Sequence, residues 1–381
     1  VFAASATPIP LYGIYRAADG LSYSDLSLTA VSYFSGAVTA LLVFGRLSNH
    51  LGRRPVILLS LGLTALACVI LLNVPSVTPL IEGRILQGLS CGLASSATTA
   101  FIVDNAPRHP PWLGAAVSSS APMVGLTVGA LGSGALVEYG PLPREVPYFA
   151  ALACLALCAL LIMASRETVS RQPGVLASLL PRVSLPHASR KLFPVASCTF
   201  IATWALGGFY QAFGPSMASD QLGSTSAVIS AVVFSSLMAP SAIGGPLAGR
   251  LSPAGAQRVG MVVFTLSVLG ILLALRMAAV VPFLLASVFA GAAQGATLTG
   301  SLRAILGPAK STERAGAFAV IYATSYSGAA IPSFIAGQLS HTLSLIEITA
   351  GYCILAIVAC IITLLAARDP RVSPTDPNLG R

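Results

Sequence analysis

Long apolar runs alternate with short polar separators along the whole chain. Twelve of these runs have about the 20 residues that a helix needs to cross a membrane. The runs are continuous, whereas barrel strands would alternate lipid-facing and lumen-facing residues, so the pattern predicts helices. The expected helices span 1–18, 26–47, 55–74, 78–103, 113–137, 147–165, 193–218, 224–248, 257–276, 280–303, 314–338 and 345–367.

The first apolar run begins at the first residue. Residues 1–10 contain no basic stretch and no small-residue cleavage site, so they do not resemble a signal peptide. They are typical of the middle of a helix. We therefore expect the numbering to begin inside the first membrane helix, after an N-terminal tail.

Composition indicates that lipid solvates the chain. It is 55% hydrophobic and 9% charged, whereas a soluble domain has about 25% charged residues. So few charges cannot cover a surface that faces water, and the lipid bilayer is the expected partner. The formal net charge is +9, but the charges lie in the separators and form no patch, so no nucleic-acid partner is predicted.

The seven cysteines all lie inside apolar runs, and none forms a CxxC pair. This placement is typical of small packing residues and predicts neither disulfides nor a metal site. The chain has no HExxH motif and no phosphate-binding glycine loop. No cofactor is therefore expected.

The positive charges predict the orientation in the membrane. If the turn at 45–55 lies in the cytoplasm, 17 of the 21 Lys and Arg residues lie on the cytoplasmic side. Cytoplasmic loops carry an excess of these residues. Both termini and the central loop are therefore expected in the cytoplasm.

The two halves of the chain repeat a short pattern. Gly45-Arg46-Leu47-Ser48 recurs as Gly249-Arg250-Leu251-Ser252, at an offset of 204. Gln87-Gly88 recurs as Gln294-Gly295 at an offset of 207, and a glycine opening the fifth helix recurs in the eleventh at an offset of 202. Three matches in order indicate a duplication. A parallel repeat of six helices is typical of transporters whose site lies between the halves.

The longest separator divides the chain into these halves, because it is polar, basic and proline-bearing. The domains expected on this basis are a six-helix bundle at 1–165, a central cytoplasmic loop at 166–192, a second six-helix bundle at 193–368 and a cytoplasmic tail at 369–381.

Three motifs resemble those of a known family. Gly45-x-Leu47-x-Asn49-x-x-Gly52-Arg53-Arg54 resembles the signature turn of the major facilitator superfamily. Arg84-x-x-Gln87-Gly88 resembles its second signature, and Ala121-Pro122-x-x-Gly125 resembles a degraded form of its third, antiporter-associated signature. The resemblance covers the whole chain and implies an all-α membrane protein with twelve transmembrane helices in two bundles. The pattern looks like bacterial drug and metabolite exporters, which implies a small-molecule substrate, the bacterial inner membrane and a monomer.

The signature turn is expected to be a conformational latch that stabilises the outward-open state. Gly45 would allow close approach of a neighbouring helix, and Gly52 would permit the turn. Family members usually carry Asp at the position of Asn49; Asn can still cap a helix but lacks the charge. Arg53 is predicted to pair with Asp104. Alternatively, the arginines of the turn only enforce topology.

Arg84 lies several residues inside the fourth expected helix. An arginine inside a membrane is costly and usually faces a partner or a wet cavity. It is predicted to bind an anionic substrate or to tune a nearby carboxylate. The alternative is a side chain that extends to the outer surface.

Polar and aromatic residues near mid-helix are the candidate lining of a substrate cavity. Tyr322 and Tyr326 are four residues apart and share a helix face, and Gln87 and Gln294 are related by the repeat. Some of the aromatics are expected to pack or to anchor at the membrane interface instead. The predicted substrate-binding residues are Tyr12, Tyr33, Arg84, Gln87, Ser119, Trp204, Tyr210, Gln211, Gln294, Tyr322 and Tyr326.

Acidic residues are missing from the middle third of every expected helix. Proton antiporters normally use a buried carboxylate as a relay. Proton coupling would therefore depend on Glu82, the deepest acid, or on Asp19. A lightly charged cavity suits neutral or amphipathic substrates. Because of Arg84, an anionic substrate remains an alternative.

The stretch Gly88-x-Ser90-x-Gly92 matches the GxSxG pattern of serine hydrolases, which requires a strand–turn–helix context. Here the pattern lies inside an apolar helix, where its glycines are expected to pack against a neighbour. The four histidines lie in or beside loops. The chain is therefore not predicted to be an enzyme.

Together these features predict a secondary active transporter that works by alternating access. Export of a small amphipathic molecule, with proton exchange as an open addition, is the favoured hypothesis. Uptake of an organic anion through Arg84 is the alternative. A transporter-like membrane sensor and an intramembrane enzyme are the hypotheses of another class.

Overall fold

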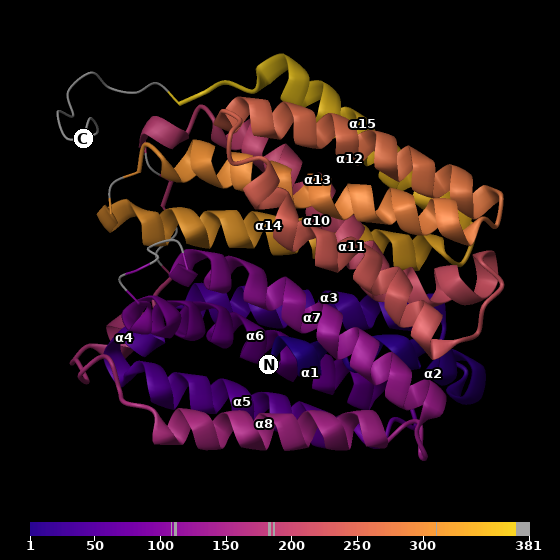
Figure 1. Ribbon diagram of the computed structural model, residues 1–381, viewed down its shortest axis with the longest axis horizontal. Helices are drawn as coiled ribbons and strands as arrows, with labels where there is room; N and C mark the ends of the chain where they lie inside the picture. The colour runs from indigo at the N-terminus through magenta and orange to yellow at the C-terminus, as the bar shows by residue number, and fades with distance from the viewer. Residues whose placement is uncertain (108, 110–112, 182–183, 186, 310, 371–381) are drawn as a thin grey trace.

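The computed structural model describes residues 1–370 apart from 108, 110–112, 182–183, 186 and 310. Every regular element in this part of the chain is a helix (Figure 1). Eleven helices among the described residues are long and apolar enough to cross a membrane, which confirms the predicted fold class. They are α3 (Tyr23–Thr39, continued by the π-helical turn η2, Ala40–Phe44), α5 (Arg53–Leu71), α6 (Val77–Asn105), α7 (Leu113–Tyr139), α8 (Val146–Ala164), α10 (Phe193–Ser216, continued by the π-helical turn η4, Met217–Gln221), α11 (Ala227–Leu247), α12 (Pro253–Arg276), α13 (Val280–Leu306), α14 (Ser311–Leu339) and α15 (Leu345–Ala366).

The first expected helix is broken. In place of one span at 1–18, the structure has α1 (Phe2–Ala6), the 3-10 turn η1 (Ile9–Leu11) and α2 (Tyr12–Asp19). Pro8 and Pro10 explain the break, because proline has no backbone N–H to donate and its ring clashes with the preceding turn. The prediction of an uninterrupted first helix is therefore wrong, whereas each of the other eleven ranges matches a helix of membrane-crossing length.

Two bundles lie side by side in Figure 1, one from α1 to α8 (indigo to magenta) and one from α10 to α15 (pink to yellow). They meet where α7 packs against α11 and where α3 packs against α14. The linker between the bundles contains the short helices α9 (Val175–Ser178) and η3 (His187–Ser189), and α9 packs against α4 (Leu47–Leu51). The domain boundaries given above stay a prediction.

The repeat-related Gly88 and Gly295 have the same structural role in the two bundles. A Cβ at Gly88 would lie 2.1 Å from the Tyr33 carbonyl oxygen, and one at Gly295 would lie 2.1 Å from the Ser241 carbonyl oxygen. In each bundle two helix backbones therefore touch, α6 against α3 and α13 against α11. Only glycine permits such an approach.

The GxSxG stretch belongs to the same helix contact. A Cβ at Gly92 would lie 2.6 Å from the Ala37 carbonyl oxygen of α3. Ser90 is fully buried, and its Oγ lies 2.6 Å from Thr64 Oγ1 of α5. These residues therefore pack helices together, as expected from their position in an apolar helix.

Candidate functional site

The pair of bundles has two ends, and different residues gather at each end. We call the end that carries α4 and the turn before α5 the loop end, and the end that carries α2 the opposite end (Figure 1). Helices α3, α6 and α12 and their neighbours run between these ends. The candidate site consists of a buried centre, a cavity at the loop end and a set of contacts at the opposite end.

The break in the first helix leaves backbone carbonyls without their usual donors. In an unbroken helix the Ala4 carbonyl would accept a bond from residue 8, which is proline here. Gln87 Nε2 donates to the Ala4 carbonyl at 3.2 Å. Arg84 Nη1 donates to the neighbouring Ser5 carbonyl at 2.7 Å. The second signature motif therefore holds the broken helix in place.

Arg84 is fully buried among these groups. Its Nη1 also donates to Gln87 Oε1 at 2.7 Å, and its guanidinium carbon lies 4.5 Å from the centroid of the Tyr33 ring. Its Nε and Nη2 have no hydrogen-bond partner among the described residues. A buried guanidinium with two unused donors is suited to bind an oxyanion or a carbonyl oxygen.

An aromatic cluster connects the two bundles. The Phe34 ring lies 5.4 Å from Tyr33 in its own helix and 6.0 Å from Tyr326 in the other bundle. Tyr326 in turn lies 4.8 Å from Trp204 and 6.3 Å from Tyr322. Helices α3, α10 and α14 thus share one cluster of rings.

Two further side chains of the predicted set, one half-buried and one buried, have buried polar atoms that are unsatisfied. Trp204 Nε1 and Gln294 Oε1 have no hydrogen-bond partner within the part of the chain that the structure describes. Buried polar atoms are normally paired. Together with Arg84 they offer donors and an acceptor to a polar ligand.

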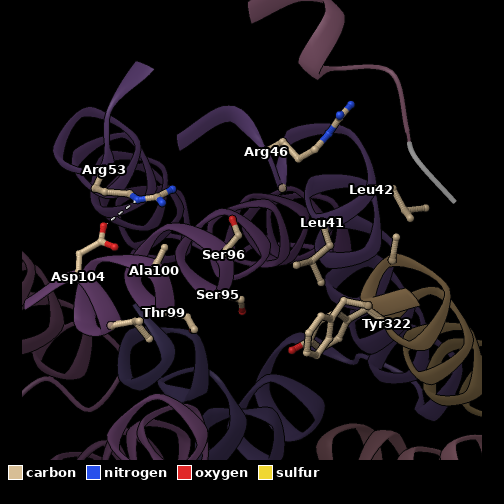
Figure 2. A pocket seen from close by; sticks show the side chains of 14 residues that line it. Leu41, Leu42, Arg46, Arg53, Ser95, Ser96, Thr99, Ala100, Asp104 and Tyr322 are labelled. Atoms are coloured by element: carbon tan, nitrogen blue, oxygen red, sulfur yellow. Dashed lines mark hydrogen bonds and ion pairs between the residues drawn. The ribbon is translucent and has the colours of Figure 1, made fainter. Parts of the chain in front are cut away.

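A cavity of about 480 Å³ lies between the bundles at the loop end (Figure 2). Its volume is in the range of pockets for small molecules. Three hydroxyl groups, of Ser95, Ser96 and Thr99, line it from α6. Leu41 and Tyr322 line it from η2 and from α14 of the other bundle. The lining is thus mixed, with hydroxyls on one side and apolar and aromatic groups on the other.

Charged residues lie at the rim of this cavity. Figure 2 shows Arg53 and Asp104 next to each other on one side and Arg46 on another. Arg46 Nη2 donates to the carbonyl oxygens of Ser178 and Leu180 at 3.0 and 2.7 Å, which attaches the linker to this rim.

The predicted substrate-binding residues fall into different places. Tyr322 lines the loop-end cavity and also contacts the aromatic cluster, to which Tyr33, Trp204 and Tyr326 belong. Ser119 is an exposed residue of α7. Their role in binding stays a prediction.

Three other members of the predicted set are buried, and two of them make hydrogen bonds inside their own bundle. Tyr12 is fully buried, and its hydroxyl accepts a bond from Thr29 Oγ1 at 3.3 Å. The Tyr210 hydroxyl lies 2.5 Å from Ser287 Oγ. Gln211 is also buried. The structure therefore does not bring these three residues to the loop-end cavity.

The residues of the expected latch lie together. Arg53 Nε lies 3.2 Å from Asp104 Oδ2, and Arg53 Nη1 donates to Asn49 Oδ1 at 2.5 Å and to Ser48 Oγ at 2.8 Å. All of these residues belong to the first bundle, so these contacts do not themselves join the bundles. The latch role stays a prediction.

The two glycines of the turn behave differently from each other. Gly52 has a φ of +100°, which favours glycine and permits the turn as expected. A Cβ at Gly45 would meet the Leu41 carbonyl oxygen of its own helix at 2.4 Å. The expected close approach of a neighbouring helix at Gly45 is therefore wrong; the space is taken by the wider π-helical turn that ends there.

Glu167, which the sequence did not single out, caps the helix that follows this turn. Its carboxylate accepts the backbone N–H groups of Arg53 and Arg54 at 2.9 and 3.0 Å. Partial burial acts to raise the pKa of Glu167, but these N–H groups and those of Thr168 and Val169 outweigh it and hold the pKa below its usual value. A negative charge thus lies at the N-terminus of α5, although position 49 carries a neutral amide.

Contacts between the bundles are found at the opposite end. Arg16 Nη1 on α2 lies 3.0 Å from Asp220 Oδ2 on η4 and donates to Ser216 Oγ at 3.1 Å. The Tyr23 hydroxyl also donates to Asp220 Oδ2. Glu138 of α7 is a further bridging residue, because its carboxylate accepts the backbone N–H of Ala227 in the second bundle. None of these residues was among the predicted site residues.

The two acids expected to couple protons lie away from the cavity at the loop end. Asp19 accepts two bonds from Arg144, at 2.8 and 3.2 Å, near the opposite end. Glu82 is exposed near the start of α6. Their role in coupling stays a prediction.

Sequence patterns that could have revealed the missed residues are weak. The hydroxyls of Ser95 and Thr99 are four residues apart and share a face of α6. Asp220 lies near a helix end and Glu167 follows one, where acids are common and no spacing marks a partner 204 or 114 residues away.

Two helical bundles with a mixed cavity between them form the architecture of a membrane transporter. The family model described as Major Facilitator Superfamily matches residues 1–209 and again 192–381. The chain therefore belongs to the major facilitator superfamily, and it is a transporter rather than an enzyme.

Sequence relatives cover only segments of the chain. A human protein named solute carrier family 2, facilitated glucose transporter member 12 is 39% identical over 89 residues, which are 23% of this chain and 14% of that protein. The multidrug resistance protein MdtM of Salmonella typhimurium is 28% identical over 151 residues, which are 39% of this chain and 36% of that protein. The chain thus spans well under half the length of these relatives.

Solved structures match over nearly the whole chain. The xylose transporter XylE from E. coli in a partially occluded inward-open conformation has a TM-score of 0.74 at 14% identity, covering 98% of this chain and 95% of that one. The nucleoside transporter NupG has a TM-score of 0.71 at 12% identity, covering 96% of this chain and 97% of that one. At such low identity these structures show the shared fold alone.

Proposed function

We propose that this transporter exports small amphipathic molecules by alternating access, with the loop end in the cytoplasm of a bacterium and the chain acting as a monomer in the inner membrane. The cavity at the loop end carries the proposal. It lies between the bundles, and its lining combines hydroxyls of α6 with Leu41, Phe318 and Tyr322. Such a lining suits a ligand with an apolar body and a few polar groups.

The direction of transport is supported by two observations. The excess of Lys and Arg in the loops of the loop end favours its placement in the cytoplasm. The similarity of part of the chain to the multidrug resistance protein MdtM favours export. A cavity at the cytoplasmic end is where an exported molecule would first bind.

Transport into everted vesicles tests this proposal. Vesicles carrying the protein would be loaded from outside with neutral and cationic fluorescent amphiphiles, with and without an imposed proton gradient. Accumulation above that of vesicles without the protein is expected. Ala100→Trp, which fills the cavity wall, should abolish it, whereas Leu66→Trp on the exposed face of α5 should not. Equal accumulation in the Ala100→Trp vesicles would refute the site.

Proton exchange through the two acids predicted from the sequence has its own test. Asp19→Asn and Glu82→Gln would be combined in one variant and assayed in the same vesicles. If its flux responds to the proton gradient as the wild type does, coupling through these acids is wrong.

Uptake of an organic anion is the second candidate, because Arg84 keeps two unused donors in a fully buried place. A buried guanidinium without an acidic partner is suited to a carboxylate or phosphate. Binding of a panel of small carboxylates to the purified protein would be compared with binding to Arg84→Lys and Arg84→Gln. If both variants bind as the wild type does, the arginine only supports the broken helix.

A further inference from the structure

A carboxylate joins the two bundles at the opposite end. Asp220 on η4 accepts bonds from Arg16 Nη1 at 3.0 Å and from the Tyr23 hydroxyl, both of which belong to the first bundle. The Arg16 guanidinium carbon also lies 4.0 Å from the centroid of the Tyr23 ring. Bonds to charged groups are about twice as strong as neutral ones. The contact that joins the bundles at the opposite end therefore depends in part on the negative charge of Asp220.

A second acid bridges the bundles beside it. Glu138, near the end of α7, accepts the backbone N–H of Ala227 at 2.8 Å. Ala227 is the first residue of α11, and the N–H groups of a first helical turn have no partner within the helix. Glu138 thus caps a helix of the other bundle, and this contact too depends on a carboxylate.

Water has access to both acids. A cavity of about 690 Å³ at this end is lined by Arg16, Glu138 and Asp220. The side chains of Arg16 and Asp220 are 24% and 30% exposed. A proton from the compartment at the opposite end can therefore reach Asp220 without crossing the buried centre.

We propose that Asp220 is a proton-binding site that controls the opening of the opposite end. The inference relies on the alternating access proposed above. A hydronium ion in the cavity transfers its proton to Asp220 Oδ2, which forms an O–H bond and leaves water behind. The carboxyl group is then neutral, and its ion pair with Arg16 is lost. The closed end is stabilised while Asp220 is ionised, and this stabilisation is lost as the pH on that side falls.

Other ionisable groups lie near Asp220 and could also respond to pH. Arg16 and Tyr23 contact it directly, and Glu138 lines the same cavity. Helix α12, which also packs against η4, ends in Arg276. Helices α10 and α11 carry no Asp, Glu, Lys or Arg. Glu138 is therefore the acid whose contribution must be separated from that of Asp220.

Asp220 differs in one respect from the acids predicted from the sequence. Asp19 pairs with Arg144, which lies in the same bundle. Protonation of Asp19 therefore breaks no contact between the bundles, whereas protonation of Asp220 does.

Electron–electron double resonance between two spin labels measures the opening directly and needs no substrate. The labels would be placed on Tyr139→Cys in the first bundle and Thr225→Cys in the second, both exposed at the opposite end, with the exposed Cys154 and Cys158 changed to Ser. The purified protein would be measured in lipid nanodiscs between about pH 7.5 and about pH 4, a range that spans the titration of carboxyl groups.

The wild-type distances should shift toward a longer population as the pH falls. In Asp220→Asn the longer population should be raised about threefold at neutral pH, since one partly exposed ion pair is lost, and its pH response should disappear. Asp19→Asn should keep the wild-type response. Arg16→Gln should have the same effect as Asp220→Asn, because it removes the same ion pair. It provides the test if the Asp220→Asn variant does not fold.

Three results would overturn the inference. They are a wild type without a pH-dependent shift, an Asp220→Asn variant that keeps the wild-type response, and a response that disappears in Glu138→Gln but not in Asp220→Asn. A pH response without any transport would refute the proposed function instead, and transport without a pH response would refute this inference alone.

Discussion

Arg54 and Arg258 lie 204 residues apart in the chain and make the same contact in the two bundles. Arg54 Nε donates to the Ile162 carbonyl oxygen at 3.0 Å, and its Nη2 donates to that of Met163. Arg258 Nη2 donates to the Ala367 carbonyl oxygen at 2.6 Å. Each arginine lies near the start of a helix, α5 or α12, and satisfies carbonyl groups at the end of the last helix of its bundle, α8 or α15.

An acid completes this contact in both bundles. Glu167 accepts the first backbone N–H groups of α5, and Asp369 Oδ1 accepts the N–H of Ala254 in the first turn of α12 at 2.8 Å. The two acids are 202 residues apart. The duplication therefore includes the way in which the third and the last membrane helix of each bundle are joined.

Removing either acid should destabilise the protein by a similar amount. Glu167→Gln and Asp369→Asn each weaken a carboxylate cap, so each should lower the free energy of unfolding by about 1 kcal/mol. Thermal denaturation in detergent would measure the change. Glu145→Gln is the control, because Glu145 precedes α8 without capping it through its side chain. An equal loss in the control would contradict the prediction.

Acidic pH should remove the contribution of Glu167 to the stability of the folded protein. Its pKa is held below the usual value in the folded protein, so its stabilising effect is complete above the unfolded pKa and is lost as the pH falls through the folded pKa. Below about pH 4 the melting temperature of the wild type should therefore approach that of Glu167→Gln. Melting curves of both proteins at several pH values would test this, and a constant difference down to about pH 2 would count against it.

The fold could be predicted from the sequence because lipid imposes it. A chain with 9% charged residues and long apolar runs can satisfy its backbone in a bilayer only as helices. The exception, the first helix, was visible in Pro8 and Pro10. It was missed because hydropathy counts apolar residues, and prolines in the membrane can be compensated by side chains such as Gln87.

The site was less predictable, because helix periodicity does not fix how two helices are rotated against each other. Tyr210 and Tyr322 look alike in sequence, since both are aromatic residues in the middle of apolar runs. In the structure Tyr210 packs against Ser287 in its own bundle, whereas Tyr322 lines the cavity between the bundles. The contact of Arg16 with Asp220 joins residues 204 positions apart and leaves no local pattern.

The broken helix should depend less on Gln87 when position 8 regains a backbone N–H that can donate to the Ala4 carbonyl. Gln87→Leu leaves the Ala4 carbonyl with fewer donors and should cost about 1–3 kcal/mol of stability. Pro8→Ala returns a backbone N–H at position 8 that can reach Ala4, so the same change should cost less in that background. A double-mutant cycle on unfolding free energies would measure the difference. Additive effects within about 0.5 kcal/mol would contradict this interpretation.

Substituting two tyrosines of the predicted binding set should affect ligand binding in one case and protein stability in the other. Tyr322→Ala removes an aromatic wall of the loop-end cavity, so it should weaken binding of an amphipathic ligand by about 1 kcal/mol, roughly a fivefold change in Kd. Tyr210→Ala leaves a space inside the second bundle and should lower stability by about 3 kcal/mol or more without changing Kd. Ligand titration and thermal denaturation of both variants would be compared. The opposite pattern would place the binding site among Tyr210 and its neighbours, inside the second bundle rather than between the two.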